Sequence, residues 1–292
     1  MLIDLIQVPY DSGHRDARMG AGPGHLVANG AVERLRQAGA EVRETAIGLE
    51  AGFTAEVRAA FDLARATAFA VRVARGRGSL PVVLAGNCIS AVGTLAALPH
   101  PATGVVWLDA HADLNTPETT TSGMVDGTAL STVLGRCWTG MTSRVDGFTA
   151  IPEEHVLLAG VRDLDPPEQY YLERSRVLVA GPESVRSRTA LAERLDTLAS
   201  RVEGVYLHVD LDVHDPAEGR ANAFAAPGGL TADEVRALIA EVAARIPITA
   251  AAITAYDPSH DEDGRVLAIA LDLLQTIAEA AAGESIDESG ES

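Results

Sequence analysis

The stretch VVWLDAHAD, residues 105–113, joins an apolar run to polar residues that alternate with alanines. The run 104–108 is apolar on both faces, which is typical of a strand inside a sheet that helices cover on both sides. Asp109, His111 and Asp113 follow it two residues apart, and an extended chain would point all three to one side. The stretch therefore predicts a buried strand that ends in a group of potential metal ligands.

Other runs along the chain repeat the apolar half of this pattern. Six of them have the length and composition of buried strands: 2–8, 81–85, 155–161, 177–180, 205–209 and 248–255. Helical patterns lie between them, the longest at 54–75, 231–245 and 266–282. The one at 231 opens with Thr231 and Glu234 in the spacing of a capping box. Strands that alternate with helices predict an α/β fold of three αβα layers around a mostly parallel sheet.

We expect one domain over residues 1–282. No internal repeat and no Pro/Gly/Ser-rich linker divides the chain, and the last ten residues, GESIDESGES at 283–292, have the composition of an acidic disordered tail. The first residues predict a strand rather than a signal peptide, because Asp4 interrupts the apolar run and no basic residue precedes it.

The charge of the chain narrows the range of partners. It carries 23 basic and 41 acidic side chains among 292 residues, a net charge of −18 that opposes binding to nucleic acid or to an anionic membrane. All the basic residues are arginines, which excludes Schiff-base chemistry and a phosphate-loop lysine. The two cysteines, Cys88 and Cys137, are too few for a disulfide framework and indicate a reducing compartment. A cytoplasmic protein with a small-molecule partner is expected.

Two more of the apolar runs end in potential ligands. The run 205–209 leads into Asp210 and Asp212, and the run 81–85 leads through a glycine turn to Cys88. A single Asp after a strand is commonly a turn former or a helix cap. Four carboxylates that converge without cations would repel one another, and two divalent ions would neutralise them. Oxygen-rich ligand sets with an imidazole favour Mn²⁺.

Four segments in order along the chain carry a specific resemblance. WLDAHADLNTPETTTSG at 107–123 and VDLDVHDP at 209–216, followed by GGLT at 228–231, closely resemble the signatures of the ureohydrolases, the arginase and agmatinase family. LAGNCISAVG at 84–93 lies where that family has its first metal-binding segment. The similarity extends over nearly the whole chain and implies an arginase-like fold and a C–N hydrolase.

The resemblance implies two manganese ions bridged by Asp109 and Asp210. One ion would also bind Asp113 and Cys88, and the other would bind His111 and Asp212. Water activated between the ions would attack a guanidinium or amidine carbon, oriented by Asp113 as a catalytic residue. Two cations can hold and activate water in this way at neutral pH.

The same resemblance implies how a substrate would be held. Asn115, Thr120 and Ser122 lie where arginase binds the carboxylate of the amino acid, and Asp165 lies where it contacts the α-amino group. Members of the family are often oligomeric, so a homo-oligomer is an expected partner state.

Four departures from the family concern the chemistry. Cys88 replaces a ligand histidine, and its thiolate is softer and adds negative charge. Ala255 replaces a glutamate that pairs with the substrate guanidinium. Asp126 replaces a proton-shuttle histidine and would serve either as a catalytic proton relay or as a helix N-cap. The segment 222–225 with Phe224 makes the guanidino end of the pocket more apolar.

These departures are similar to those of variant arginase-like hydrolases that release hydroxyurea from Nω-hydroxy-L-arginine during D-cycloserine synthesis. We therefore expect a guanidino, N-hydroxyguanidino or amidino substrate, with L-arginine a poor one. The alternatives are a formimino or amide hydrolase on the same scaffold and a catalytically silent metal- or ligand-binding protein. His208, in the alternation of Asp210 and Asp212, is either a partner of the metal ligands or a packed strand histidine.

Overall fold

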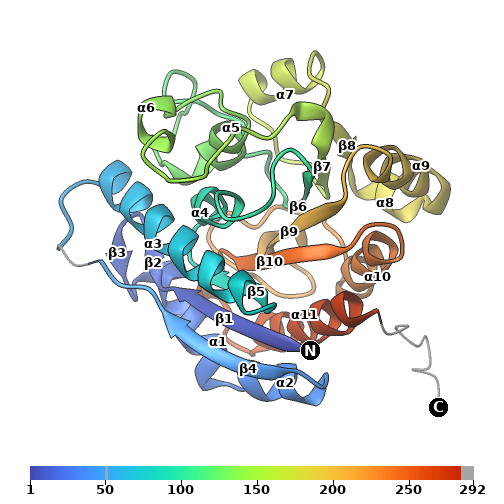
Figure 1. Cartoon of the computed structure of the whole chain (residues 1–292). Helices are drawn as coiled ribbons and strands as arrows, with labels where there is room; N and C mark the ends of the chain where they lie inside the picture. Colours follow the sequence, from blue (N-terminus) through green and yellow to red (C-terminus); the bar gives the residue numbers. More distant parts are fainter. Residues whose placement is uncertain (50–51, 284–292) are drawn as a thin grey trace.

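The computed structural model describes residues 1–49 and 52–283 and is built around one parallel sheet (Figure 1). The strand order is β4-β1-β5-β10-β9-β6-β7-β8, and all the pairings between these neighbours are parallel. The strands are β1 Leu2–Val8, β4 Glu41–Ala46, β5 Leu80–Ala85, β6 Thr103–Leu108, β7 Val156–Ala159, β8 Leu178–Ala180, β9 Gly204–Asp210 and β10 Ile248–Thr254. A small hairpin, β2 Tyr10–Asp11 with β3 His14–Arg15, stands beside the sheet.

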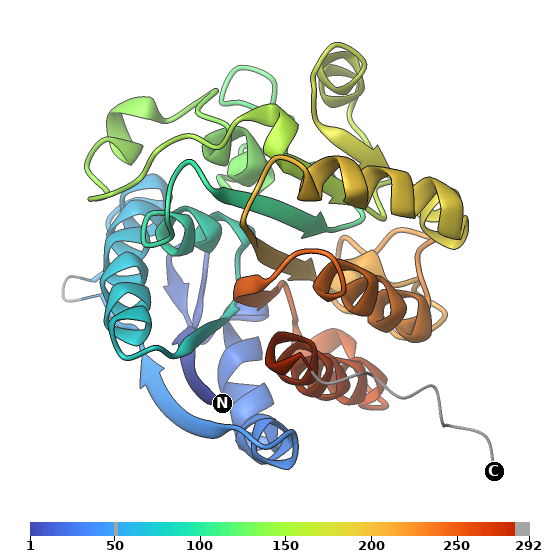
Figure 2. The ribbon, with the colours of Figure 1, turned by 45° about the vertical axis from the view of Figure 1, so that its right-hand side comes forward.

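Helices cover both faces of this sheet, as a three-layer fold requires. One face carries α1 Gly22–Ala28, α2 Ala31–Gln37, α8 Pro182–Arg186, α9 Arg188–Ala199, α10 Ala232–Ala243 and α11 Arg265–Ala282. The other carries α3 Glu56–Gly76, α4 Ala91–Leu95 and α5 Ala129–Val133, with α6 Thr139–Thr142 and α7 Pro166–Leu172 at the edge. Figure 2 shows α10 and α11 lying side by side against the sheet. Short 3₁₀ helices complete the fold: η1 Arg18–Ala21, η2 Cys88–Ser90, η3 Asp126–Thr128, η4 Glu153–His155, η5 Leu211–Val213 and η6 Pro258–His260.

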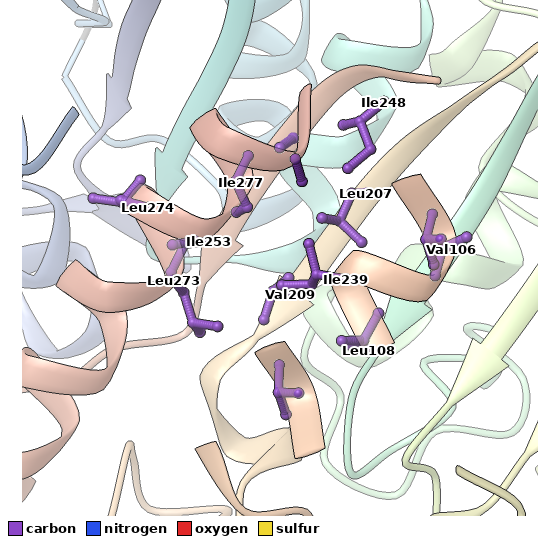
Figure 3. Close-up of a cluster of buried hydrophobic side chains, with 14 of the residues drawn as sticks. Val106, Leu108, Leu207, Val209, Ile239, Ile248, Ile253, Leu273, Leu274 and Ile277 are labelled. Atoms are coloured by element: carbon purple, nitrogen blue, oxygen red, sulfur yellow. The ribbon is translucent and has the colours of Figure 1, made fainter. Parts of the chain in front are cut away.

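The central strands are buried on both faces, and successive side chains enter different halves of the core. Val106 and Leu108 pack with Leu207 and Val209 under α10 and α11, the cluster drawn in Figure 3. Trp107 and Tyr206 point to the opposite face, toward α3, α4 and α5. Which half of the core a strand residue joins is therefore set by the two-residue period of the strand.

The structure confirms the expected α/β fold and its mostly parallel sheet. The seven apolar runs form strands at nearly the expected bounds, and the capping box of Thr231 and Glu234 opens α10. The edge strand β4 was not expected, because its sequence EVRETA is charged and its side chains are mostly exposed. An edge strand pairs along one side only and needs no apolar face to do so.

Two expectations concern the ends of the chain and membranes. The expected tail 283–292 lies, apart from Gly283, outside the described residues; Gly283 ends α11 with φ of 75°. In the ranges 1–49 and 52–283, no helix combines the length and the apolar composition needed to cross a membrane.

Candidate metal centre and substrate cavity

The expected ligands come together because four neighbouring strands end at the same edge of the sheet. In the order β5, β10, β9 and β6, these strands lead to Cys88, Ala255, Asp210 and Asp109. In a parallel sheet, residues just beyond the carboxyl ends of adjacent strands meet in one crevice. Asp109, Asp210 and Asp212, all buried, line this crevice together with Cys88.

One group of donor atoms consists of Asp109, His111 and Asp212. The Nδ1 atom of His111 lies 3.4 Å from Asp109 Oδ1 and 3.4 Å from Asp212 Oδ2. One donor atom from each of the three residues lies within 4.8 Å of the others, which is close enough for them to share an ion. These are three of the four ligands that the sequence resemblance implies for one of the two ions; the fourth is the second bridging residue, Asp210.

A second group lies beside it, around Cys88. Its Sγ atom is 3.1 Å from Asp210 Oδ2, and donor atoms of Cys88, Asp109 and His208 lie within 4.8 Å of one another. Both Cys88 and His208 are buried. The sequence placed His208 only beside the ligands, whereas the structure brings it within reach of this group.

Asp113 reaches the same cavity by a turn that the alternation of residues does not predict. The expectation of an extended chain through Asp113 is wrong, because this residue has φ of 53°. Asp tolerates the left-handed region better than most residues, and here its carbonyl oxygen accepts a hydrogen bond from Ser131 N at 3.0 Å. Its carboxylate is buried, and the Oδ2 atom has no hydrogen-bond partner in the described part of the chain.

The charges of these groups are unbalanced without cations. Burial raises the pKa values of Asp113 and Asp210 well above the usual range, with Asp109 as a further cause in each case. Although burial opposes it, the contacts with Asp109 and Asp212 raise the pKa of His111 to about 12. A protonated His111 thus occupies the position between two carboxylates where a cation would be stable.

The residues present fit a pair of divalent ions. The unpartnered Asp113 Oδ2, the carboxylates on both sides of His111 and the contact of Cys88 with Asp210 are what a ligand set shows when its acceptors face a common centre. The ligand set is rich in oxygen with one imidazole, which suits Mn²⁺, and the sulfur makes the Cys88 position softer than the other.

Hydrogen bonds to the carboxylates fix their orientation. Asp109 Oδ2 accepts from Trp107 Nε1 at 3.0 Å, and Asp212 Oδ2 is 3.3 Å from Asn222 Nδ2. Trp107 could have been found from the sequence, since it precedes Asp109 by two residues on the same strand face. Asn222 comes from a distant loop, and no pattern near it indicates the contact.

Asp126 lies at the first position of η3 but does not cap it, so the helix N-cap alternative is wrong. Its carboxylate instead accepts hydrogen bonds from Asn87 Nδ2 at 2.8 Å and from Ile89 N at 3.0 Å. These two residues flank Cys88, and Asp126 therefore holds the turn that presents the thiol. Burial raises the pKa of Asp126 to about 7.

A cavity of about 230 Å³ opens above the carboxylates. Asn115, Ser122 and Asp165 line it as expected, and Asn115 Nδ2 donates to Asp165 Oδ2 at 2.8 Å. Thr120 is not among the lining residues; its hydroxyl oxygen accepts from Gly123 N at 3.1 Å and supports the loop, while its neighbour Thr121 faces the cavity. Sequence reasoning missed Thr121 and five further lining residues, which are Met19, Met124, Gly127, Asp163 and Glu168.

Ala255, Asn222 and Phe224 also line the cavity, and the sequence resemblance implies that the guanidino group of a substrate would lie beside them. The backbone of Ala255 is fully bonded: its N–H donates to Ala85 O at 3.3 Å, and its carbonyl oxygen accepts from Asn222 Nδ2 at 2.9 Å. Its methyl group is what it offers to a ligand. Phe224 remains 47% exposed at the mouth.

Comparisons with known proteins match this chain over nearly its whole length. The family model described as "Arginase family" matches residues 2–279. The arginase of Bacillus caldovelox is 30% identical over 291 residues, covering 94% of this chain and 97% of the relative. The crystal structure of arginase from Bacillus cereus superimposes with a TM-score of 0.87 at 27% identity, covering 98% of this chain and 100% of that one. Formimidoylglutamase from Bacillus subtilis shares the fold, with a TM-score of 0.75 at 17% identity, covering 97% of this chain and 88% of that one.

Proposed function

Because the chain belongs to the arginase family, and is therefore a metal-dependent hydrolase of the ureohydrolase type, we propose that it cleaves a C–N bond in a guanidino compound of lowered basicity. Nω-Hydroxy-L-arginine is the substrate that we propose first. We further propose two Mn²⁺ ions as cofactors and the cytoplasm as its location, since both cysteines are free and buried.

The substrate proposal rests on Ala255, whose side chain has no carboxylate to pair with a guanidinium. An alkylguanidinium is protonated at neutral pH, and losing its hydration without a carboxylate partner costs several kcal/mol. Besides the proposed metal ligands, the residues that we place around the guanidino group are Ala255, Asn222 and Phe224, which line the cavity and bear no charge. A guanidine that is neutral for more of the time avoids the penalty, and an N-hydroxy substituent lowers basicity in this way.

The remaining acidic residues of the cavity do not compensate, because each has other partners. Glu168 accepts from Leu114 N at 2.8 Å and from Asp165 N at 3.0 Å. Asp165 accepts from Asn115, and Asp126 accepts from the turn around Cys88. Asp163 is exposed at the rim, with its Oδ2 3.8 Å from His111 Nε2.

We assign the metal ligands as Cys88, Asp109, His111, Asp113, Asp210 and Asp212, with Asp109 and Asp210 shared. When bound, the ions supply Lewis acidity that activates water and polarises the substrate. Asp113 orients the water through its unpartnered oxygen, and Asp126 exchanges a proton with the reacting centre, a role that suits its pKa of about 7.

At the other end, Asn115 and Ser122 bind the substrate carboxylate, with Thr121 beside them and Thr120 supporting their loop. Asp165 binds the α-amino group. Asp165 also accepts a hydrogen bond from the side-chain amide of Asn115, which fixes the distance between the residues that bind the α-amino group and the carboxylate. The cavity therefore favours a free α-amino acid as substrate.

Steady-state kinetics on the manganese-loaded protein test the proposal. We expect kcat/KM for Nω-hydroxy-L-arginine to exceed that for L-arginine by at least about tenfold, equivalent to roughly 1.4 kcal/mol. Equal values for the two compounds would contradict the substrate assignment. Full metal loading with no turnover of any guanidino or formimino compound would support a silent binding protein instead.

A further inference from the structure

Three buried polar side chains connect in a line to Cys88 on the α3 side of the sheet. Tyr206 Oη lies 2.8 Å from His208 Nδ1, and His208 Nε2 lies 3.3 Å from Thr254 Oγ1. Thr254 Oγ1 lies 3.2 Å from Cys88 Sγ. Tyr206 and His208 come from β9 and Thr254 ends β10, and all are at most 1% exposed.

The direction of these hydrogen bonds follows from Tyr206. In the described part of the chain, the bond to His208 is the one hydrogen bond of this phenol, and a buried hydroxyl hydrogen without an acceptor is costly. The phenol therefore donates to Nδ1. Because Nδ1 accepts this bond, it carries no hydrogen, and the N–H of the imidazole ring must be on Nε2.

The donors of the two remaining hydrogen bonds, from His208 to Thr254 and from Thr254 to Cys88, follow from this tautomer. The Nε2–H group donates to Thr254 Oγ1, and the threonine hydroxyl passes its own hydrogen on. Its possible acceptors are Cys88 Sγ at 3.2 Å and Val209 O at 3.5 Å. The first is short for a bond to sulfur, whereas the second is at the limit for a bond to oxygen. Thr254 thus donates to the sulfur of Cys88.

The sulfur can accept this bond whether or not a metal is bound. Without a metal, the thiol hydrogen points to Asp210 Oδ2 at 3.1 Å, and a lone pair of the sulfur remains for Thr254. The ring of His208 is held in place by stacking on Trp107, with centroids 3.6 Å apart and planes at 15°. The side chains of this donor series therefore have their orientation before a metal binds.

We propose that Tyr206, His208 and Thr254 form a one-way chain of hydrogen-bond donors that ends on the Cys88 sulfur and makes Thr254 a positioning residue for the metal site. This inference rests on the proposed assignment of Cys88 as a metal ligand. A thiolate donates more charge to an ion than an imidazole does, and a hydrogen bond to the sulfur withdraws part of that charge. These hydrogen bonds therefore allow a cysteine to be the ligand at this position while the ion retains its Lewis acidity.

The competing arrangement has His208 Nε2 as a direct ligand, since donor atoms of Cys88, Asp109 and His208 lie within 4.8 Å of one another. That arrangement needs the proton on Nδ1 and leaves the hydrogen of Tyr206 without an acceptor. The two arrangements differ in the tautomer of one ring, which can be measured.

Cobalt-loaded full-length protein provides the first test. Thr254→Val removes the hydroxyl at nearly constant shape, and Thr254→Ser is the matched control that keeps it. We expect the thiolate-to-cobalt charge-transfer band of the wild type to move to longer wavelength in the valine variant and to stay in place in the serine variant. The kcat of the manganese-loaded valine variant should fall by about tenfold, as is usual when a partner of a metal ligand is lost.

A valine variant that binds cobalt with an unshifted band would overturn the donor chain alone. A wild type without the band would overturn the assignment of Cys88 as a ligand, and the chain with it. Should the valine variant fail to fold, nitrogen-15 spectra of histidine-labelled wild type decide the matter, with His208→Gln identifying the resonances. We expect the Nε2–H tautomer at His208. A coupling between cadmium and a ring nitrogen of His208 in cadmium-loaded protein would show that the ring binds the metal, and would overturn the proposal.

Discussion

The side-chain amide of Asn222 donates a hydrogen bond to the carbonyl oxygen of Ala255 at 2.9 Å. Ala255 has φ of 62°, a left-handed conformation that costs a non-glycine residue about 1–2 kcal/mol. The same amide nitrogen lies 3.3 Å from Asp212 Oδ2. Asn222 therefore connects Ala255, which lines the cavity, to Asp212, one of the proposed metal ligands, and stabilises a strained backbone at the end of β10.

Asn222→Ala should destabilise the protein and weaken metal binding together. The carbonyl of Ala255 would lose its buried donor, which lowers the free energy of unfolding by about 1–3 kcal/mol, and Asp212 would lose an orienting contact. Urea denaturation and manganese titration measure the two effects. Asn29→Ala, which removes an exposed asparagine beyond α1, is the control and should change neither.

The proposed bridging carboxylates make a prediction about metal content. Asp109→Asn and Asp210→Asn should each remove both ions, because each residue serves two, whereas Asp212→Asn should weaken mainly one. Metal analysis of the dialysed variants gives the numbers. Asp196→Asn, at a surface ion pair with Arg245, is the matched control. A bridging variant that retains full occupancy would show that the bridge is assigned wrongly.

Cys88 and Cys137 make a matched pair, since both are buried and free. Cys88→Ser should abolish the thiolate-to-cobalt band and lower metal affinity by about 10-fold or more. Cys137→Ser should leave both unchanged, because this thiol contacts Thr132 and the carbonyl of Thr128 away from the carboxylates. Identical cobalt spectra for the wild type and Cys88→Ser would mean that the sulfur is not bound.

Metal binding should stabilise the protein more as the pH rises. In the metal-free protein, burial raises the pKa of Asp109 from 3.8 to about 6, so the folded state binds more protons than the unfolded state in that window and loses stability as the pH rises through it. An ion replaces those protons, and its affinity grows as they leave. At a hundredfold excess over Kd the gain is about 2.7 kcal/mol. Thermal melts with and without Mn²⁺ should differ more at about pH 8 than at about pH 5; the reverse order would contradict this linkage.

The sequence predicts which potential ligands gather at this edge of the sheet, because a strand fixes the direction of each side chain at its end. Asp109, Asp210 and Cys88 each follow an apolar run, and neighbouring parallel strands bring such residues to one edge. Where the chain leaves regular structure, the prediction fails. Asp113 turns into the cavity through a left-handed conformation that residue spacing does not reveal.

The supporting contacts show the same limit in another form. Asn222 and Thr254 reach the ligands from segments far away in the sequence, and only the tertiary fold makes them neighbours. The edge strand β4 lacks the apolar pattern by which strands are recognised, since its side chains face solvent. His208 illustrates both cases: its alternation with Asp210 placed it near the ligands, but the role of its ring depends on Tyr206 and Thr254.

The substrate preference should be reversible at Ala255. Ala255→Glu restores a carboxylate at the guanidino end, where the cavity of about 230 Å³ leaves room for a longer side chain. The substitution adds no new backbone strain, because alanine already adopts φ of 62° and glutamate meets the same cost. The new charge offsets the desolvation of a protonated guanidinium, so kcat/KM for L-arginine should rise relative to Nω-hydroxy-L-arginine by about tenfold or more, roughly 1.4 kcal/mol. Ala255→Gln matches the glutamate in size without its charge and should leave the ratio near that of the wild type. If the glutamine and glutamate variants shift the ratio equally, side-chain volume rather than charge determines the choice of substrate.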